Sequence, residues 1–378
     1  MIDFLSEAEN LKADLIKIRH ELHKNPELSA HEYKTAEFIE NVFKSLDIKT
    51  CRASETGIIA RLNFNNAGKN IALRADMDAL PTNEETGADF SSVNNGIMHA
   101  CGHDVHMTGL LGAAMILNKH KNDLNGSVTF LLEPDEEDKG GALPLIKSGA
   151  LENVNAVFGA HVSPDLPLGH VGFKYGAFYA AAEVFKIIIT GKSSHAAERQ
   201  KGVDALETAA EIVTAALKIQ GGVISVCKFH SGTAVNIIAD RAELEGIIRT
   251  FGLDNRKRMC DELAGLVEKI AADHKAEALC ILKDSYPGVV NDDKMTDLAK
   301  NAAEKILGSE RVHVIDKPVM MTEDFGYYIT KIPGTFYHIG AGCELPLHNN
   351  KFLPSDEILT TLAATHSAII SDALNNKA

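Results

Sequence analysis

Three histidines and one cysteine fall within eight residues of the segment GIMHACGHDVHM, residues 96–107. Cys101 and His103 are two positions apart, and in extended backbone such side chains point to the same side. Gly102 between them allows a tight turn, and Asp104 is expected to cap the helix that follows. A thiolate beside imidazoles suits zinc or another first-row transition metal better than magnesium or calcium. The segment therefore predicts a transition-metal site.

Further potential donors follow the predicted strands, where open α/β folds place their ligands. A carboxylate, imidazole or thiol after each of several strands is what a metal site on such a fold requires. The additional candidates are Asp76, Asp78, His99, His106, Glu136, Glu137, His161, Glu323, Asp324 and His348.

The adjacent carboxylates of Glu136 and Glu137 suggest a division of work. One can bind a metal ion while the other takes a proton from a metal-bound water. Taken alone, PDEEDK could equally be a solvated acidic loop, because four of its six residues are acids. The strand before it and the Gly-Gly pair behind it favour a site.

Two other interpretations of the cysteine segment stay open on the residues alone. A single histidine or cysteine is often an ordinary core residue. A Cys–His catalytic dyad is the sharper alternative, and it predicts activity that survives a chelator and is lost on alkylation. The dyad needs an orienting group and an oxyanion hole, and it leaves Glu136, Glu137, His161 and His348 without a role.

Composition limits the class of protein. The chain has 378 residues, 45% of them hydrophobic, which is enough for more than one domain with a sizeable core. Its net charge of −14 argues against nucleic acid or an anionic membrane as a partner, because both need basic surface. The six cysteines are scattered, and we find neither a signal peptide nor an apolar run of about 18 residues. We therefore expect a cytoplasmic protein.

The order of the predicted elements indicates an α/β protein with an inserted domain. Two helices, near 3–24 and 35–46, precede an alternation of strands (57–64, 70–74, 127–133, 154–161) and helices (104–120, 140–149), which predicts a mostly parallel sheet. The pattern resumes from about 288 with helices at 291–307 and 355–374.

Between these two parts the order of elements changes to strand, helix, strand, strand, helix, strand. This is the ferredoxin-like order, with elements near 178–190, 203–219, 223–229, 241–250, 255–274 and 276–283. We predict a discontinuous catalytic domain, residues 1–177 and 288–378, and an inserted lid or dimerisation domain, residues 178–287.

A series of motifs along the whole chain resembles the dinuclear metallo-amidohydrolases. This family includes hippurate hydrolase, auxin-conjugate hydrolases and N-acetyl-diaminopimelate deacetylase. Its more distant relatives, the aminoacylases and metallo-carboxypeptidases, use Asp where this branch uses Cys. The motifs are IRHELHKNPELSAHEYKTAEFI, LRADMDALP, MHACGHDVHM, EPDEEDKGGA, GAHVSPDLPLG, GKSSHAAERQKGVDAL, GIIRTF, MMTEDFGYY and LHNNKF.

The resemblance implies a site for two divalent transition-metal ions, which could be zinc, manganese, nickel or cobalt. Cys101 would bridge the two ions and Glu136 would be the general base. The other ligands implied are His103, Glu137, His161 and His348. Asp78 and Asp104 are candidates for carboxylates that do not bind metal but hydrogen-bond to the ligands and orient them.

In the family, the inserted domain is a lid and often a dimerisation surface, so a homodimer is expected. The HAA motif points to His195, which would polarise the scissile carbonyl in its own or the partner subunit. Asn236 and Arg249 resemble the family's contacts to the substrate amide and carboxylate. On the residues alone, His195 and Arg249 could equally be surface residues.

The predicted activity is hydrolysis of the amide bond of an N-acyl-amino acid, with a metal-bound hydroxide as the nucleophile and Glu136 as the base. Alternatives are a dipeptidase or carboxypeptidase acting on short peptides, and a metal-binding protein without activity. The intact Glu136 argues against the last of these. After HAA the chain has Glu198-Arg199-Gln200 where the family commonly has a Pro-His pair, so the acyl group and amino acid preferred stay open.

Overall fold

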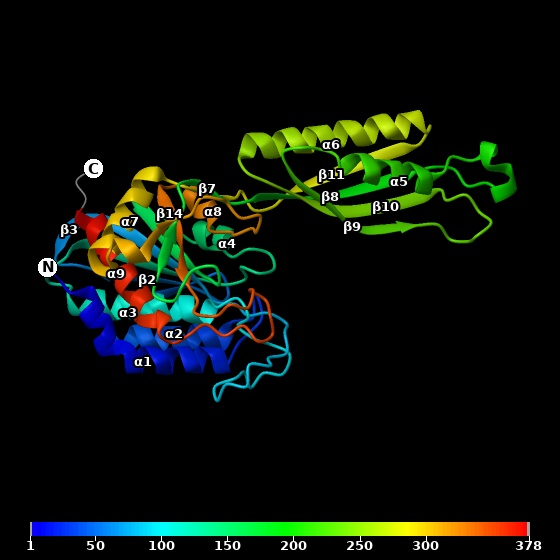
Figure 1. Ribbon diagram of the computed structural model, residues 1–378. Helices are drawn as coiled ribbons and strands as arrows, with labels where there is room; N and C mark the ends of the chain where they lie inside the picture. The colour runs from blue at the N-terminus through cyan, green and yellow to red at the C-terminus, as the bar shows by residue number, and fades with distance from the viewer. Residues whose placement is uncertain (1, 376–378) are drawn as a thin grey trace. The chain divides into compact units, whose positions relative to one another are not determined.

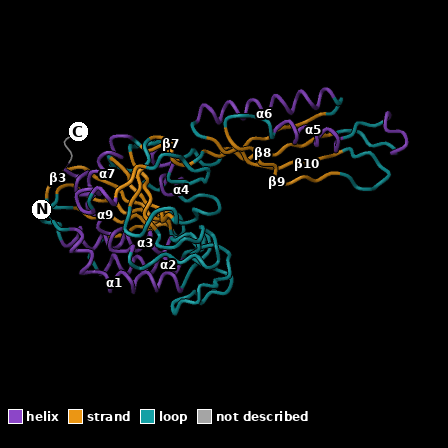
Figure 2. The backbone as a smooth tube through the Cα atoms, in the orientation of Figure 1, coloured by secondary structure: helices purple, strands orange, loops and turns teal. Residues whose placement is uncertain are grey.

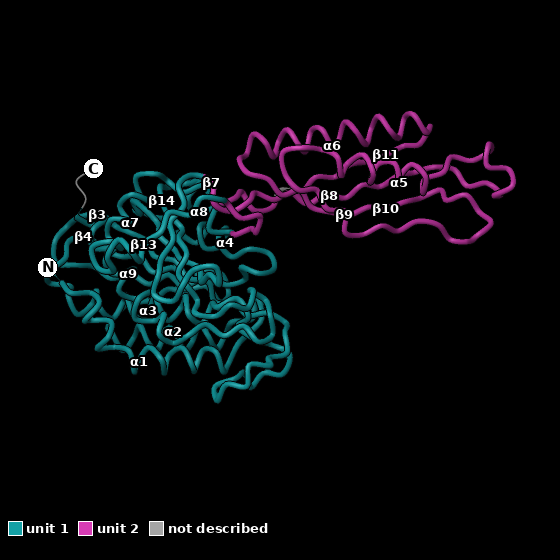
Figure 3. Tube along the Cα trace, in the orientation of Figure 1, with its two compact units in different colours: residues 1–176, 290–317, 324–378 teal, residues 177–289, 318–323 magenta. Residues whose placement is uncertain are grey.

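The computed structural model describes residues 2–375 and divides into two compact units (Figure 3). The larger unit comprises residues 1–176, 290–317 and 324–378, and the smaller unit comprises residues 177–289 and 318–323. The predicted insertion, 178–287, does not include residues 318–323. Their backbone pairs within the smaller unit, where the Val319 N–H donates to the Phe178 carbonyl oxygen at 2.8 Å.

The larger unit is built on an eight-stranded sheet in the order β1-β2-β4-β3-β5-β14-β6-β13. The neighbours β4, β3, β5 and β14 are parallel, as the alternation of strands and helices predicted. Every residue of β5 and β14 is buried, which is typical of parallel strands covered on both faces. The strands are β1 (Lys49–Ala53), β2 (Gly57–Asn63), β3 (Asn66–Asp76), β4 (Asn125–Glu133), β5 (Ala156–Ser163), β6 (Val171–Phe173), β13 (Val312–Val314) and β14 (Gly334–Gly340).

Helices α1 (Phe4–Lys24), α3 (His103–Lys119), α7 (Asp293–Leu307) and α9 (Ile358–Asn375) pack together beside this sheet (Figure 1). Helix α3 is buried almost along its whole length, and small and apolar residues make up most of it. A Cβ atom added at Gly109 would lie 2.4 Å from the Leu362 side chain, so glycine allows α3 and α9 to approach closely. This packing fixes the helix that carries the cysteine segment at its start.

The smaller unit has a four-stranded antiparallel sheet in the order β11-β8-β10-β9, and two helices (Figure 2). Its elements are β8 (Ala181–Thr190), α5 (Ala205–Ala216), β9 (Gly222–Ser231), β10 (Arg241–Thr250), α6 (Leu253–Asp273) and β11 (Glu277–Asp284). Their order confirms the ferredoxin-like prediction. Apolar residues of both helices and of the sheet form one buried cluster.

Three further α-helices and two further strands lie within the described residues. They are α2 (Tyr33–Ser45), α4 (Ala142–Lys147), β7 (Gly176–Tyr179), β12 (Val289–Asn291) and α8 (Gly326–Ile329). The sequence pattern did not predict β1, β14 or the three-residue strands β6, β12 and β13, and it merged β7 with β8. Within residues 2–375, no helix has the length and apolar character needed to span a membrane.

Candidate metal centre

The carboxyl ends of the parallel strands bring the expected ligands of the larger unit together. Asp76 and Glu133 end β3 and β4 side by side, and His161 lies near the end of β5. The segment that carries Cys101 leads directly into α3. Ligands from distant parts of the sequence therefore meet at the carboxyl ends of the parallel strands, as expected for an open α/β fold.

Two groups of potential ligand atoms share Cys101. The first is Cys101, His103 and His161, and the second is Cys101, Glu137 and His348, with the atoms of each group within 4.8 Å of one another. Cys101 Sγ lies 3.4 Å from His161 Nε2, and Glu137 Oε1 lies 3.2 Å from His348 Nε2. All five expected ligands are thus brought together, with the thiol common to both groups.

The ring of His103 is oriented as a ligand would be. Its Nδ1 donates to the carbonyl oxygen of Asp78 at 2.9 Å, so Nε2 faces the other ligands. This Nε2 and Glu137 Oε1 are 3.9 Å apart, and neither has a hydrogen-bond partner among the described residues, although both are buried. Buried polar atoms without partners are rare, and a cation between these two would satisfy both. The residues present therefore fit a metal ion.

His161 and His348 reach the site by different means. His161 Nδ1 donates to the Val162 carbonyl oxygen at 2.7 Å, which directs Nε2 toward Cys101. His348 has a left-handed backbone with φ of 66°, a conformation that is uncommon outside glycine. Such local strain often occurs at functional sites.

The surroundings of Cys101 disfavour a free thiolate. Burial raises the pKa of this thiol well above its ordinary value, and the carboxylates of Glu137 and Glu136 raise it further. A nucleophilic cysteine needs electropositive surroundings that lower its pKa. This electrostatic environment argues against the Cys–His dyad, whereas a bound cation would stabilise the thiolate.

Two details of the cysteine segment correct our expectations. Helix α3 begins at His103, and Gly102 occupies its N-cap position with a left-handed φ of 85°. Cys101 and His103 therefore converge across a tight turn and not along extended backbone. A Cβ atom at Gly102 would lie 2.5 Å from Val162 Cγ2, so both the backbone conformation and the space available require glycine.

Asp104 does not cap α3, because it lies inside the first turn of that helix. Its Oδ2 accepts hydrogen bonds from His23 Nδ1 at 2.9 Å and Arg19 Nε at 3.1 Å. These contacts tie α3 to α1. Asp78, the other expected supporting carboxylate, contacts His103 directly, with its Oδ1 3.3 Å from Nδ1.

The third histidine of the segment, His106, has both ring nitrogens in hydrogen bonds. Its Nδ1 lies 2.6 Å from Asp76 Oδ1, and its Nε2 accepts the Val162 N–H at 2.9 Å. His106 thereby braces the end of β5 beside His161. His99 is buried and belongs to neither group of potential ligands.

Glu136 and Glu137 lie in a tight turn, residues 134–141, which we call the glutamate loop. Glu136 is 8% exposed, and one of its oxygens lies within 4.8 Å of donor atoms of His103 and Glu137. The Glu137 N–H donates to Asp78 Oδ2 at 3.0 Å, which fixes the loop beside His103. The two carboxylates are therefore both at the site, and only Glu137 belongs to a group that shares Cys101.

Arg74 is a residue of this region that the sequence analysis missed. It is buried and contacts three carboxylates, those of Asp76 at 2.7 Å, Glu133 at 2.8 Å and Asp324 at 2.9 Å. Asp324 was expected as a potential metal donor, and one of its oxygens lies within 4.8 Å of a Glu136 oxygen. Its oxygens also accept from Arg74 and from the Ala142 N–H. An arginine within the apolar strand sequence NIALRAD is the signal that could have indicated a buried ionic cluster.

The three expected residues of the inserted domain all lie in the smaller unit. His195 is exposed at the start of a short 3-10 helix, η1 (Ala196–Lys201), which contains the departure Glu198-Arg199-Gln200. The Ala196 N–H donates to the Asn236 carbonyl oxygen at 3.0 Å, so His195 and Asn236 lie on adjoining loops. Arg249 lies at the far end of β10, and its Nη1 donates to the Met320 carbonyl oxygen at 2.9 Å.

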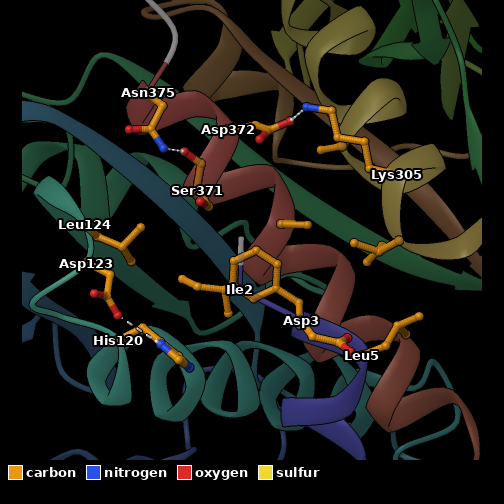
Figure 4. Close-up of a pocket in the computed structure, with 14 residues that line it drawn as sticks. Ile2, Asp3, Leu5, His120, Asp123, Leu124, Lys305, Ser371, Asp372 and Asn375 are labelled. Atoms are coloured by element: carbon orange, nitrogen blue, oxygen red, sulfur yellow. Dashed lines mark hydrogen bonds and ion pairs between the residues drawn. The ribbon is translucent and has the colours of Figure 1, made fainter.

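A cavity of about 960 Å³ lies elsewhere in the larger unit (Figure 4). Leu124 on its wall precedes β4, which places the cavity toward the amino end of that strand. None of its lining residues is an expected ligand, and its Lys305 pairs with Asp372 at 2.6 Å. This cavity is therefore separate from the ligands, which lie at the carboxyl ends of the strands.

Comparisons with known proteins agree with this geometry. The sequence pattern of Peptidase family M20/M25/M40 matches residues 72–372. The chain is 36% identical to an N-acetylcysteine deacetylase of Bacillus subtilis, with 92% of this chain and 93% of the relative covered. It is 35% identical to thermostable carboxypeptidase 2 of Saccharolobus solfataricus, with 96% of each covered. The crystal structure of the Bacillus subtilis YXEP protein, described as a dinuclear metal binding peptidase, is similar with a TM-score of 0.90 and 33% identity, over 97% of this chain and 99% of that one.

Proposed function

Because the chain belongs to Peptidase family M20/M25/M40, and is therefore a hydrolase that acts on amide bonds, we propose that it hydrolyses N-acyl-amino acids to a carboxylate and a free amino acid. The observation that carries this proposal is the pair of ligand groups sharing Cys101, with the Glu136 carboxylate beside them. A protein that only bound metal would not need the second carboxylate.

Two divalent transition-metal ions, held by the five expected ligands, would polarise the scissile carbonyl and make water nucleophilic near neutral pH. Cys101 would contact both ions, with His103 and His161 on one and Glu137 and His348 on the other. Thiolate and imidazole ligands favour zinc, manganese, nickel or cobalt over magnesium and calcium. The ring orientations of His103 and His161 support this assignment.

Glu136 would serve as the general base. Its carboxylate is buried among the ligands, where it can accept a proton from the attacking water and deliver it to the leaving nitrogen. Glu137 is its neighbour on the loop but belongs to the ligand group. The two side chains thus have separate tasks.

His195 would donate a hydrogen bond to the carbonyl oxygen as negative charge develops there. Its Nδ1 accepts the Ala197 N–H at 3.1 Å, so in the neutral ring the hydrogen is on Nε2. The exposed Nε2–H is then a donor available to a substrate. Asn236, on the adjoining loop, and Arg249 would contact the substrate amide and carboxylate, since a guanidinium suits a carboxylate.

The subunits are proposed to form a homodimer through the smaller unit. Both edge strands of its sheet carry exposed apolar side chains, Val223 and Phe229 on β9 and Leu279 and Ile281 on β11. An exposed apolar edge strand can pair with a second copy. Sedimentation of the full chain should give a dimer that Phe229→Lys or Leu279→Lys weakens, and a monomer at all concentrations would contradict the proposal.

The substrate class is tested with matched pairs of compounds. N-acetyl, N-benzoyl and longer N-acyl amino acids should be hydrolysed in the presence of zinc, manganese, nickel or cobalt. Dipeptides with a free amino group should be poor substrates, and their preference over acylated compounds would establish the carboxypeptidase or dipeptidase alternative. Chelation should abolish turnover and added metal restore it, whereas turnover that survives chelation and is lost on alkylation would identify a thiol enzyme.

A further inference from the structure

The glutamate loop is closed at its base but has little core of its own. A Cβ atom at Gly141 would lie 1.8 Å from the Pro134 carbonyl oxygen, so the two ends of the loop touch. Asp138 and Lys139 at its tip are exposed. A short, charged loop of this kind needs contacts from outside to hold Glu136 and Glu137 in place.

The first outside contact is made by Glu32, a fully buried carboxylate at the start of α2. Its Oε1 accepts the Asp135 N–H and the Ala30 N–H, both at 2.9 Å, and its Oε2 accepts the Thr56 hydroxyl at 2.8 Å. Asp135 has a left-handed φ of 60° and directly precedes Glu136. Glu32 therefore fixes the strained residue from which the base extends.

The second outside contact is made by Asp324, also fully buried, at the opposite end of the loop. Its Oδ2 accepts the Ala142 N–H at 3.0 Å, and its Oδ1 accepts from Arg74 Nη2 at 2.9 Å. Arg74 also pairs with Glu133, which immediately precedes the loop, at 2.8 Å. Asp324 thus ties the end of the loop to the strand from which the loop begins.

We propose that Glu32 and Asp324 are positioning residues that clamp the two ends of the glutamate loop. Neither belongs to the two ligand groups that share Cys101. The inference rests on the proposed function for the roles of Glu136 and Glu137 and for the two metal ions. Because metal ligation tolerates shifts of only about 0.2 Å, a loosened loop should weaken the ligand group of Cys101, Glu137 and His348. The group of Cys101, His103 and His161 takes no residue from the loop and should be spared.

The chemistry of the two clamps predicts different outcomes for similar substitutions. Arg74 Nη2 and the Ala142 N–H donate to different oxygens of Asp324. An amide has only one acceptor oxygen, so Asp324→Asn must lose one of these two contacts. In Glu32→Gln the amide oxygen can still accept hydrogen bonds from the Ala30 and Asp135 N–H groups. Its amino group can donate to the Thr56 hydroxyl, which can turn and accept. Glu32→Gln should therefore resemble the unsubstituted protein, whereas Glu32→Ala should not.

The experiment compares Glu32→Ala, Glu32→Gln and Asp324→Asn with Thr335→Val, which removes a buried hydroxyl contact to Thr296 away from the loop. Hydrogen exchange of the metal-free chain should quicken in residues 134–142 of Glu32→Ala and Asp324→Asn alone. Calorimetric titration with Zn²⁺ should show that Glu32→Ala and Asp324→Asn bind one of two zinc equivalents about 10–100-fold more weakly than the unsubstituted protein does. In the same two variants kcat should fall while KM changes little.

Several results would overturn the clamp. Unchanged exchange in residues 134–142, equal weakening of both zinc equivalents, or the same loop exchange in Thr335→Val would each contradict it. The exchange measurement needs neither metal nor substrate. A chain that hydrolyses no N-acyl-amino acid would therefore refute the proposed function while the clamp is still decided by exchange.

Discussion

At the scale of single residues, Cys101 shows how a buried group can depend on a cation. Burial opposes ionisation of its thiol and the nearby carboxylates oppose it further, and its Sγ belongs to both ligand groups. His103 is the complementary case. Burial would lower its pKa, but the carboxylates of Asp76, Asp78 and Glu137 together raise that pKa to about 10. In the metal-free protein at neutral pH, both side chains are therefore protonated.

Metal binding should consequently release protons. Ligation requires the thiolate and a neutral imidazole, so loading at pH 7 should release about two protons, and apparent affinity should fall as pH falls. Calorimetric titration in buffers of different ionisation enthalpy measures this release. Cys101→Asp is the matched control, since a carboxylate ligand should release about one proton fewer. Binding without proton release would contradict a protonated Cys101 and a protonated His103 in the metal-free protein.

The two adjacent glutamates should separate by phenotype. Glu136→Gln should retain metal and lose turnover by about 10²–10⁴-fold, the usual contribution of general acid–base catalysis. Glu137→Gln should instead bind less metal. Metal content by mass spectrometry, measured beside kcat for both variants, tests the assignment. If the two phenotypes came out exchanged, the base would be Glu137.

At the scale of elements, the turn into α3 determines whether Cys101 and His103 converge. Gly102→Ala imposes a side chain on a left-handed residue and drives its Cβ against Val162. The backbone term is roughly 1–2 kcal/mol and overpacking adds typically 1–3 kcal/mol. Urea unfolding of the metal-free chain should show that Gly102→Ala lowers the free energy of unfolding by the sum of these two terms.

Gly87 provides a matched control for that substitution. It has a similar φ of 73°, with nothing within 4 Å of an added Cβ atom. Gly87→Ala should therefore lose only the backbone term and bind metal normally, whereas Gly102→Ala should also bind metal more weakly. Equal losses of stability in the two variants would show that Val162 imposes no constraint.

The elements also show what the sequence could predict. The long periodic helices and the order of strands predicted the parallel sheet and the ferredoxin-like unit, because burial on one face repeats in the sequence. The cap of α3 was predicted wrongly, since a side chain typical of caps, Asp104, follows a glycine that adopts the cap position itself. The cluster around Arg74 joins residues 250 positions apart, and no local pattern encodes such a contact.

At the scale of the whole molecule, the proposed reaction needs both units. The expected ligands and Glu136 all lie in the larger unit, and His195, Asn236 and Arg249 all lie in the smaller unit. The sequence order shows only that the smaller unit interrupts the larger one. Solution experiments with variants decide whether His195 serves a site of its own subunit or of a partner.

His195 provides the test of this division. Loss of one oxyanion donor typically lowers kcat by about 10²–10³-fold, so His195→Ala should lose that much while keeping its fold and its metals. Lys269→Ala, which removes an exposed side chain of α6 in the smaller unit and on neither edge strand of its sheet, should leave kcat unchanged. An unaltered kcat in His195→Ala would exclude the role.

Mixing two variants distinguishes action of His195 in its own subunit from action in the partner's site. If His195 acts on the partner's site, a mixed dimer of His195→Ala and Glu136→Gln contains one intact composite site, and activity should return after the subunits exchange. If His195 acts within its own subunit, every site in the mixed dimer lacks either the donor or the base, and no activity returns. Subunit exchange is checked with a labelled copy, so that absence of recovery has one meaning. Recovery would show that dimerisation through the smaller unit is part of catalysis, because each site would then depend on a residue from the other chain.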